Sequence, residues 1–308
     1  MLTKRDKHRQ ALQPLLNAAI DSPGLLSPKE LNMARFSLNM DIRTHLLDPD
    51  IAALEDYLLD HSKLPGRRAN LELAWAFADE VGALCRDGEV SLRRSYIATE
   101  WLLWELMQRY PPATFGSDPD SPLQMPQLCS AIAFGEWAAA FQHIERGIEV
   151  LLELASSPLW RVREAVAMGL QRMLTTRWTS TVRRLRRRQI DLTPYEWRAV
   201  AAGLAEPDLL QTTQNALDAL DLHYAALAYL RRLPATMRRH EAVRTLRQGL
   251  GYTLSVVVVA APAAGFAQMQ ACAAWDDSDI RWVLRENLKK KRLSAWPDQV
   301  AALRDALT

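Results

Sequence analysis

Cysteine is scarce in this chain. Its 308 residues include three cysteines, Cys85, Cys129 and Cys272, which are widely separated and form no CxxC pair. An odd number of isolated cysteines does not fit a disulfide framework, and their spacing does not fit a zinc cluster. We therefore expect reduced thiols in a cytoplasmic protein.

Long hydrophobic runs are also missing. The uncharged stretch Gln248–Trp275 has a continuous apolar core, Leu254–Ala261, of only eight residues, and Pro262 and Gly265 interrupt the remainder. A membrane-spanning helix needs about 20 apolar residues. The stretch therefore predicts a buried helix that turns at Ala261–Pro262, and no membrane association. The opening residues, MLTKRDKHRQALQPLL, carry charges throughout, so we expect no signal peptide.

Common catalytic motifs are absent from the sequence. It contains no glycine-rich phosphate loop, no HExxH, no GxSxG and no histidine or cysteine spacing typical of a metal site. Its six histidines are scattered along the chain. The sequence therefore predicts no catalytic residue, no cofactor and no bound metal ion, and an enzyme is not expected.

Glycine is scarce as well, whereas alanine and leucine dominate a hydrophobic content of 49%. Both residues favour helices, and no sustained β-branched alternation indicates a strand. Most of the 16 prolines lie between apolar periodic segments, where they separate helices. The sequence predicts an all-α protein with helices at 4–20, 28–37, 50–61, 67–87, 92–110, 124–135, 137–156, 159–177, 179–190, 194–205, 208–221, 222–233, 237–260, 262–274, 278–292 and 297–307.

A helical pattern recurs at Ser157–Leu174 and Asp277–Leu293, each with a tryptophan and two arginines in its first turns. Four similar windows begin at residues 159, 209, 238 and 279, with a mean spacing of about 40 residues, as in HEAT and armadillo repeats. We expect an α-solenoid of degenerate HEAT-like repeats. Its divisions are an N-terminal helical region at 1–110, a proline-rich loop at 111–126 and a solenoid at 127–308, or one continuous solenoid over 1–308.

The net charge of +2 conceals two unlike halves. Residues 1–156 carry 15 Lys/Arg and 22 Asp/Glu, whereas residues 157–308 carry 23 and 14. The basic residues of the second half cluster, which is typical of a surface that binds a nucleic acid or an acidic protein segment, or of a solvated helix face. The predicted partner-binding residues are Arg183, Arg184, Arg186, Arg187, Arg188, Arg238, Arg239, Lys289, Lys290, Lys291 and Arg292.

Two short segments, Trp160–Ala165 (WRVREA) and Arg281–Glu286 (RWVLRE), resemble helices of the HEAT-like alkylpurine DNA glycosylases, the bacterial DNA alkylation repair proteins. The resemblance implies a basic DNA-binding groove, in which Arg163 and Trp282 would be groove residues. The family places its catalytic aspartate on a helix upstream of the groove arginine. The comparable segment here, Gly135–Phe141 (GEWAAAF), has no aspartate.

The sequence leaves three hypotheses. The first is a non-enzymatic HEAT-like solenoid that binds a nucleic acid or an acidic protein segment on a basic C-terminal concave surface. The second is a DNA glycosylase-like or DNA-damage-binding protein that uses Arg163, Trp282 and Asp276. The third is an assembly module in which the acidic and basic halves of two chains pair. The sequence does not decide the oligomeric state.

Overall fold

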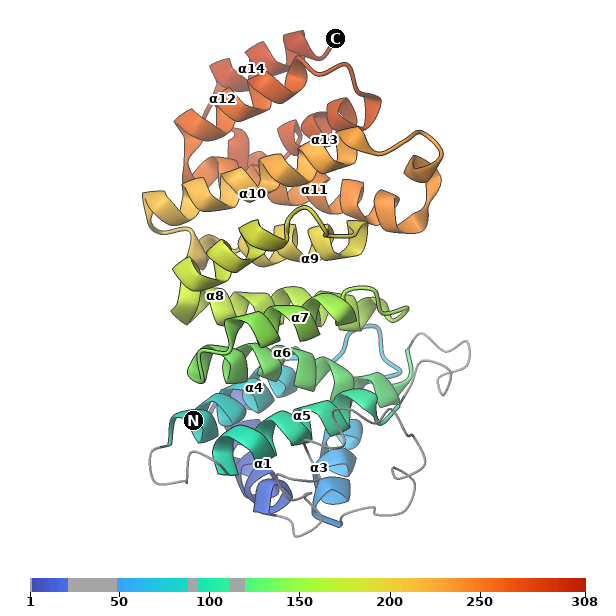
Figure 1. The fold of residues 1–308 in the computed structure, drawn as a ribbon, viewed down its shortest axis with the longest axis vertical. Coiled ribbons are helices and arrows are strands. Elements are labelled where there is room, and N and C mark those ends of the chain that lie inside the picture. The colour runs from blue at the N-terminus through green and yellow to red at the C-terminus, as the bar shows by residue number, and fades with distance from the viewer. Residues whose placement is uncertain (1, 22–48, 88–93, 111–119) are drawn as a thin grey trace. The chain divides into compact units, whose positions relative to one another are not determined.

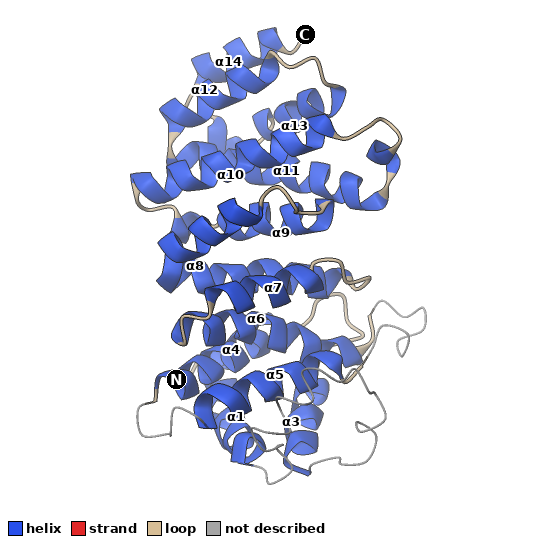
Figure 2. Ribbon diagram, in the orientation of Figure 1, coloured by secondary structure: helices blue, strands red, loops and turns tan. Residues whose placement is uncertain are grey.

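The computed structural model describes residues 2–21, 49–87, 94–110 and 120–308. Over these residues the protein is helical and contains no strand (Figure 2), which confirms the all-α prediction. No helix in the described ranges is both long enough and apolar enough to span a bilayer. The α-helices are α1 (Lys4–Asp21), α3 (Pro49–Asp60), α4 (Leu71–Arg86), α5 (Thr99–Gln108), α6 (Met125–Ala140), α7 (Ile144–Leu154), α8 (Trp160–Arg188), α9 (Pro194–Leu204), α10 (Thr213–Arg232), α11 (Glu241–Ala260), α12 (Pro262–Ala273), α13 (Ser278–Leu288) and α14 (Pro297–Ala306).

Several helices begin where polar side chains cap them. At the start of α9, Thr193 and Glu196 form a reciprocal capping box, and Pro194 occupies the first helical position. At the start of α13, the Asp277 carboxylate accepts hydrogen bonds from the N–H groups of Asp279 and Ile280. Such bonds satisfy backbone donors that have no partner within the helix. Asp277 is thus the residue that caps α13.

Some predicted helix breaks are wrong. α6 continues past Gly135 to Ala140, because Gly135 is buried within the helix and the chain turns only at Gln142, which adopts a left-handed φ of 59°. The predicted break near residue 221 is also absent, since α10 is one continuous helix. The break predicted after residue 177 is a kink within α8, where Arg177 has φ −131° and ψ 39°. The helix expected at 28–37 lies outside the described residues.

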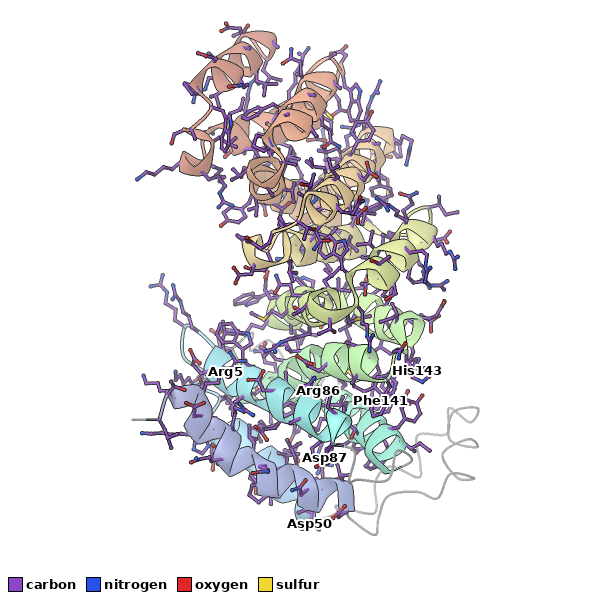
Figure 3. All side chains as sticks on the ribbon, turned by 90° about the vertical axis from the view of Figure 1, so that its left-hand side faces the viewer. Arg5, Asp50, Arg86, Asp87, Phe141 and His143 are labelled. Atoms are coloured by element: carbon purple, nitrogen blue, oxygen red, sulfur yellow. The ribbon has the colours of Figure 1, made fainter. Side chains whose placement is uncertain are left out.

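The chain forms two compact units, and the first comprises Met1–Gly147 and Ser157–Ala165. In this unit α4 packs between α1 and α6, α3 packs on α1, and α5 packs on α6. Its core includes fully buried Phe77, Phe134 and Trp137. Phe141 and His143 lie beside each other after α6 (Figure 3), and both rings contact Tyr96.

The second unit comprises Ile148–Ser156 and Val166–Thr308. Here α11 packs between α9 and α13, while α10, α12 and α14 form a second set of helices against them (Figure 1). α9 also lies close to α8, since a Cβ added at Gly203 would lie 3.1 Å from the Cβ of Leu170. The turn expected at Ala261–Pro262 is confirmed, because α11 ends at Ala260 and α12 begins at Pro262.

Candidate functional site: a cationic and aromatic face on the second unit

Tyr252 is the centre of the candidate site. It lies on α11, and its side chain is unusually open to solvent for a large ring, at 52% exposure. The Arg292 guanidinium carbon lies 4.7 Å from the centre of the tyrosine ring, and the Lys290 ammonium lies 5.3 Å from it. Cations at these distances are attracted to the electron-rich face of an aromatic ring. The contacts therefore hold two positive charges beside one exposed aromatic surface.

The end of α13 places the two cations there. The sequence predicts that Lys289–Arg292 continues this helix, but the prediction is wrong, because α13 ends at Leu288 and Lys290 is extended with φ −77° and ψ 127°. A single 3-10 turn, Lys291–Leu293, then follows. Leu293 is 1% exposed and anchors this turn in the core. The chain thereby turns back toward α11, and Lys290 and Arg292 reach Tyr252.

A second aromatic–cation pair lies beside the first. The Arg247 guanidinium carbon of α11 is 4.8 Å from the centre of the Trp282 ring on α13. Arg247 also donates to Asp279 at 2.6 Å, which fixes the guanidinium in place. Gly251 makes the close approach of Trp282 possible, because a Cβ at this position would lie 3.0 Å from the indole Cζ3. We call Tyr252, Lys290, Arg292, Trp282 and Arg247 the Tyr252 cluster.

Further polar residues extend the face along α11 and toward α9. Arg244, Gln248 and Tyr252 are all exposed, and their spacing of four residues places them on one side of the helix. On the neighbouring helix, the Arg198 side chain passes close to α11, since a Cβ added at Gly249 would lie 3.1 Å from Arg198 Cγ. Helices α9 and α11 and the segment that follows α13 thus contribute cations to this part of the second unit.

The arginines of α8 are a separate group with mixed roles. Arg186 forms ion pairs with Asp218 at 2.8 Å and with Asp221 at 2.9 Å, and Arg188 lies 4.0 Å from Glu149. Asp218 also accepts a hydrogen bond from the Trp178 indole N–H. Arg184 is half-buried, whereas Arg183 and Arg187 are exposed.

Arg238 forms ion pairs and hydrogen bonds within the protein. Its guanidinium donates to the carboxylates of Asp277 and Asp279 at 2.7–3.0 Å and to the backbone carbonyls of Leu233 and Arg231. The hydrogen bond to Asp277 raises the pKa of Arg238 above its usual value. These contacts tie the segment before α11 to the start of α13. Its neighbour Arg239 is exposed.

The residues singled out by the family resemblance lie in different compact units. Arg163 belongs to the first unit, where its guanidinium donates to the backbone carbonyls of Ser157 and Pro158 before α8. Trp282 belongs to the second unit. The Asp276 carboxylate is fully exposed and lies 3.8 Å from the Arg281 guanidinium. In the described ranges, no group of three or more histidine, cysteine or carboxylate side chains is arranged to hold a metal ion.

The structure therefore brings together Trp282, Lys290 and Arg292 among the predicted binding residues. Lys289 is paired with Glu286 at 2.5 Å, and Lys291 is exposed. Sequence reasoning missed Tyr252 and Arg247. The available signal was the repeat of Arg244, Gln248 and Tyr252 at intervals of four residues, which predicts one exposed side of an otherwise apolar helix.

Comparison with known proteins adds no functional assignment. The chain matches no protein-family model, no curated protein and no solved structure. The candidate function accordingly rests on the geometry of the Tyr252 cluster and its surroundings.

Proposed function

We propose that this protein is a non-enzymatic HEAT-like helical-repeat protein whose second unit binds a nucleic acid through the Tyr252 cluster. The observation that carries this proposal is the exposed Tyr252 ring with Lys290 and Arg292 beside it. Cations provide the attraction to phosphates, and an aromatic ring provides a surface for a base. An acidic protein segment would use the cations but would gain less from the ring.

The helix arrangement supports the repeat interpretation. In the second unit α9, α11 and α13 pack in succession, and α10, α12 and α14 alternate with them along the chain. Stacked helix pairs produce such an alternation, in which each pair buries its apolar side against its neighbours. The same arrangement places the exposed sides of successive helices next to one another. This supports a binding face that extends over more than one repeat.

The cysteines support a reducing compartment, such as the cytoplasm. Cys85, Cys129 and Cys272 are all buried free thiols. Burial raises the pKa of the Cys85 and Cys272 thiols to about 12, which disfavours the reactive thiolate. These side chains therefore act as small apolar core residues.

The proposal predicts binding to nucleic acid that weakens steeply as salt rises. In fluorescence anisotropy titrations with a labelled oligonucleotide, the Lys290→Gln/Arg292→Gln double variant should bind more weakly than the wild type. The slope of log affinity against log salt should also be smaller in magnitude by about 1 to 2, because a phosphate contact that is lost no longer releases a counterion when the nucleic acid binds. Both residues follow the end of α13 at Leu288, so circular dichroism should show an unchanged helix content.

A matched control removes two exposed arginines from α8 instead. The Arg183→Gln/Arg187→Gln variant loses the same net charge and should retain most of the affinity. Equal losses in the two double variants would contradict a site at the Tyr252 cluster. Binding to polyglutamate, with none to any oligonucleotide, would support the acidic-protein hypothesis and overturn the proposal.

A further inference from the structure

We infer that the nucleic acid taken by this face is single-stranded, with an unpaired base stacked on the Tyr252 ring. This inference rests on the proposed function and specifies which form of nucleic acid the site selects. It depends on two comparisons. The first is between Tyr252 and the other aromatic side chains of the second unit, and the second is between the groups that a single strand and a duplex offer to this site.

The Tyr252 ring is open to a ligand. At 52% exposure, Tyr252 is the most exposed phenylalanine, tyrosine or tryptophan of the second unit. In the described part of the chain no other aromatic ring packs against it. Tyr224 is the informative comparison. It is 39% exposed, but its ring lies against Trp275 with a centroid distance of 5.3 Å. The ring contacts of Tyr252 in the described structure are instead with the cations of Lys290 and Arg292.

The backbone that carries the ring is part of a packed helix. Tyr252 is an interior residue of the twenty-residue helix α11, and its chain neighbours Gly251 and Thr253 are buried. The helix is therefore already ordered before a flat ligand binds. The Arg292 and Lys290 cations lie 4.7 and 5.3 Å from the ring centre. One nucleotide could therefore place its base near Tyr252 while its phosphates contact Lys290 and Arg292.

A duplex would make poor use of this arrangement. Its bases are paired and stacked inside the helix, so its backbone gives phosphates to the lysine and arginine but no free base face to the tyrosine. A single strand offers both groups, and aromatic stacking is tolerant of sequence because every base has a flat face. The guanidinium plane of Arg247, held over Trp282, adds a second flat group beside the first. These features favour a single strand.

The test measures binding of labelled oligothymidylate, an abasic oligonucleotide of equal length and a duplex of equal length by fluorescence anisotropy at low salt. We expect the wild type to prefer oligothymidylate. Tyr252→Ala should weaken oligothymidylate binding roughly 5- to 150-fold, the range for loss of one stacked base. The same substitution should leave binding to the abasic strand and to the duplex within about twofold. In a parallel titration with oligouridylate, Tyr252→Ala should cause the same loss of affinity if the site binds RNA as tightly as DNA.

Two control variants separate stacking from other effects. Tyr252→Phe keeps the flat ring and should retain near-wild-type affinity. Tyr224→Ala removes the exposed tyrosine that packs on Trp275 and should leave oligothymidylate affinity unchanged. Preference for the duplex, or equal loss on abasic and base-containing strands in Tyr252→Ala, would overturn the single-strand inference while the proposed function stood. Absence of salt-dependent binding to all three probes would overturn the proposed function itself.

Discussion

Replacing Asn287 by alanine is expected to lower the free energy of unfolding of the second unit by about 3 kcal/mol. Asn287 lies on α13 and is completely buried. Its Oδ1 accepts a hydrogen bond from the Ser255 N–H at 2.7 Å, and its Nδ2 donates to the carbonyls of Leu250 at 2.9 Å and Val283 at 2.8 Å. Each intramolecular hydrogen bond contributes about 1 kcal/mol net, and removal of a buried side chain also leaves a cavity. One side chain thus joins α11 to α13.

Urea denaturation followed by circular dichroism would measure this loss. Asn215→Ala is a matched control, because Asn215 is a half-buried asparagine of α10 that donates one hydrogen bond, to the Leu209 carbonyl. Its loss should be about 1 kcal/mol. A loss in Asn287→Ala no larger than that in Asn215→Ala would contradict the bridging role. The comparison also tests whether Asn287 holds together the two helices that carry Tyr252 and Trp282, two residues of the proposed binding face.

Acid should destabilise the second unit through His223. This residue lies in α10 with no exposed surface, and Nδ1 hydrogen-bonds with the Ala219 carbonyl at 2.8 Å. The opposite nitrogen, Nε2, is buried without a hydrogen-bond partner in the described structure. Burial lowers the pKa of His223 from 6.5 to about 4, because a charged imidazolium would lose its hydration. The folded state therefore keeps the neutral ring.

The direction of the pH effect follows from this lowered pKa. Between pH 6.5 and about 4 the unfolded state binds more protons at His223 than the folded state does. The stability contributed by the neutral ring is thus complete above pH 6.5 and falls as the pH drops below that value. The total loss by pH 4 should be on the order of 3 kcal/mol, since one pKa unit corresponds to about 1.4 kcal/mol.

The measurement is the difference in unfolding free energy between wild type and His223→Leu across this pH range. The leucine variant lacks the titrating ring, so its stability should decline less steeply between pH 6.5 and 4. Burial also lowers the pKa of His8, in the first unit, so the subtraction is needed to isolate His223. Parallel pH profiles for the two proteins would show that His223 does not carry the effect.

Local sequence signals were sufficient for most of the helices. The helix starts at Pro194, Pro262 and Pro297 follow from a proline in the first helical turn, and the start of α13 follows from the Asp277 cap. The predicted break at Gly135 failed because a glycine in a helix can serve packing rather than termination. A single glycine gives the same local signal in both situations.

The proposed binding face was harder to predict because it depends on contacts between distant segments. Arg186 and Arg238 belong to basic clusters that look alike in sequence, yet both pair with carboxylates 32 to 41 residues away. Lys290 and Arg292 remain near the surface only because the helix ends at Leu288 and the next turn returns toward α11. The position of Tyr252 opposite that turn depends on how α11 and α13 pack against each other. No local sequence pattern predicts this packing.

The buried cysteines provide a separate reporter for each compact unit. Cys85 and Cys129 lie in the first unit, and Cys272 lies in the second. A maleimide reagent can reach these thiols only when the surrounding helices open, so the alkylation rate at each cysteine follows the opening of its own unit. In pulsed alkylation read by peptide mass spectrometry, Asn287→Ala should accelerate modification of Cys272 and leave Cys129 unchanged. The native thiols would thus show whether the two units unfold independently.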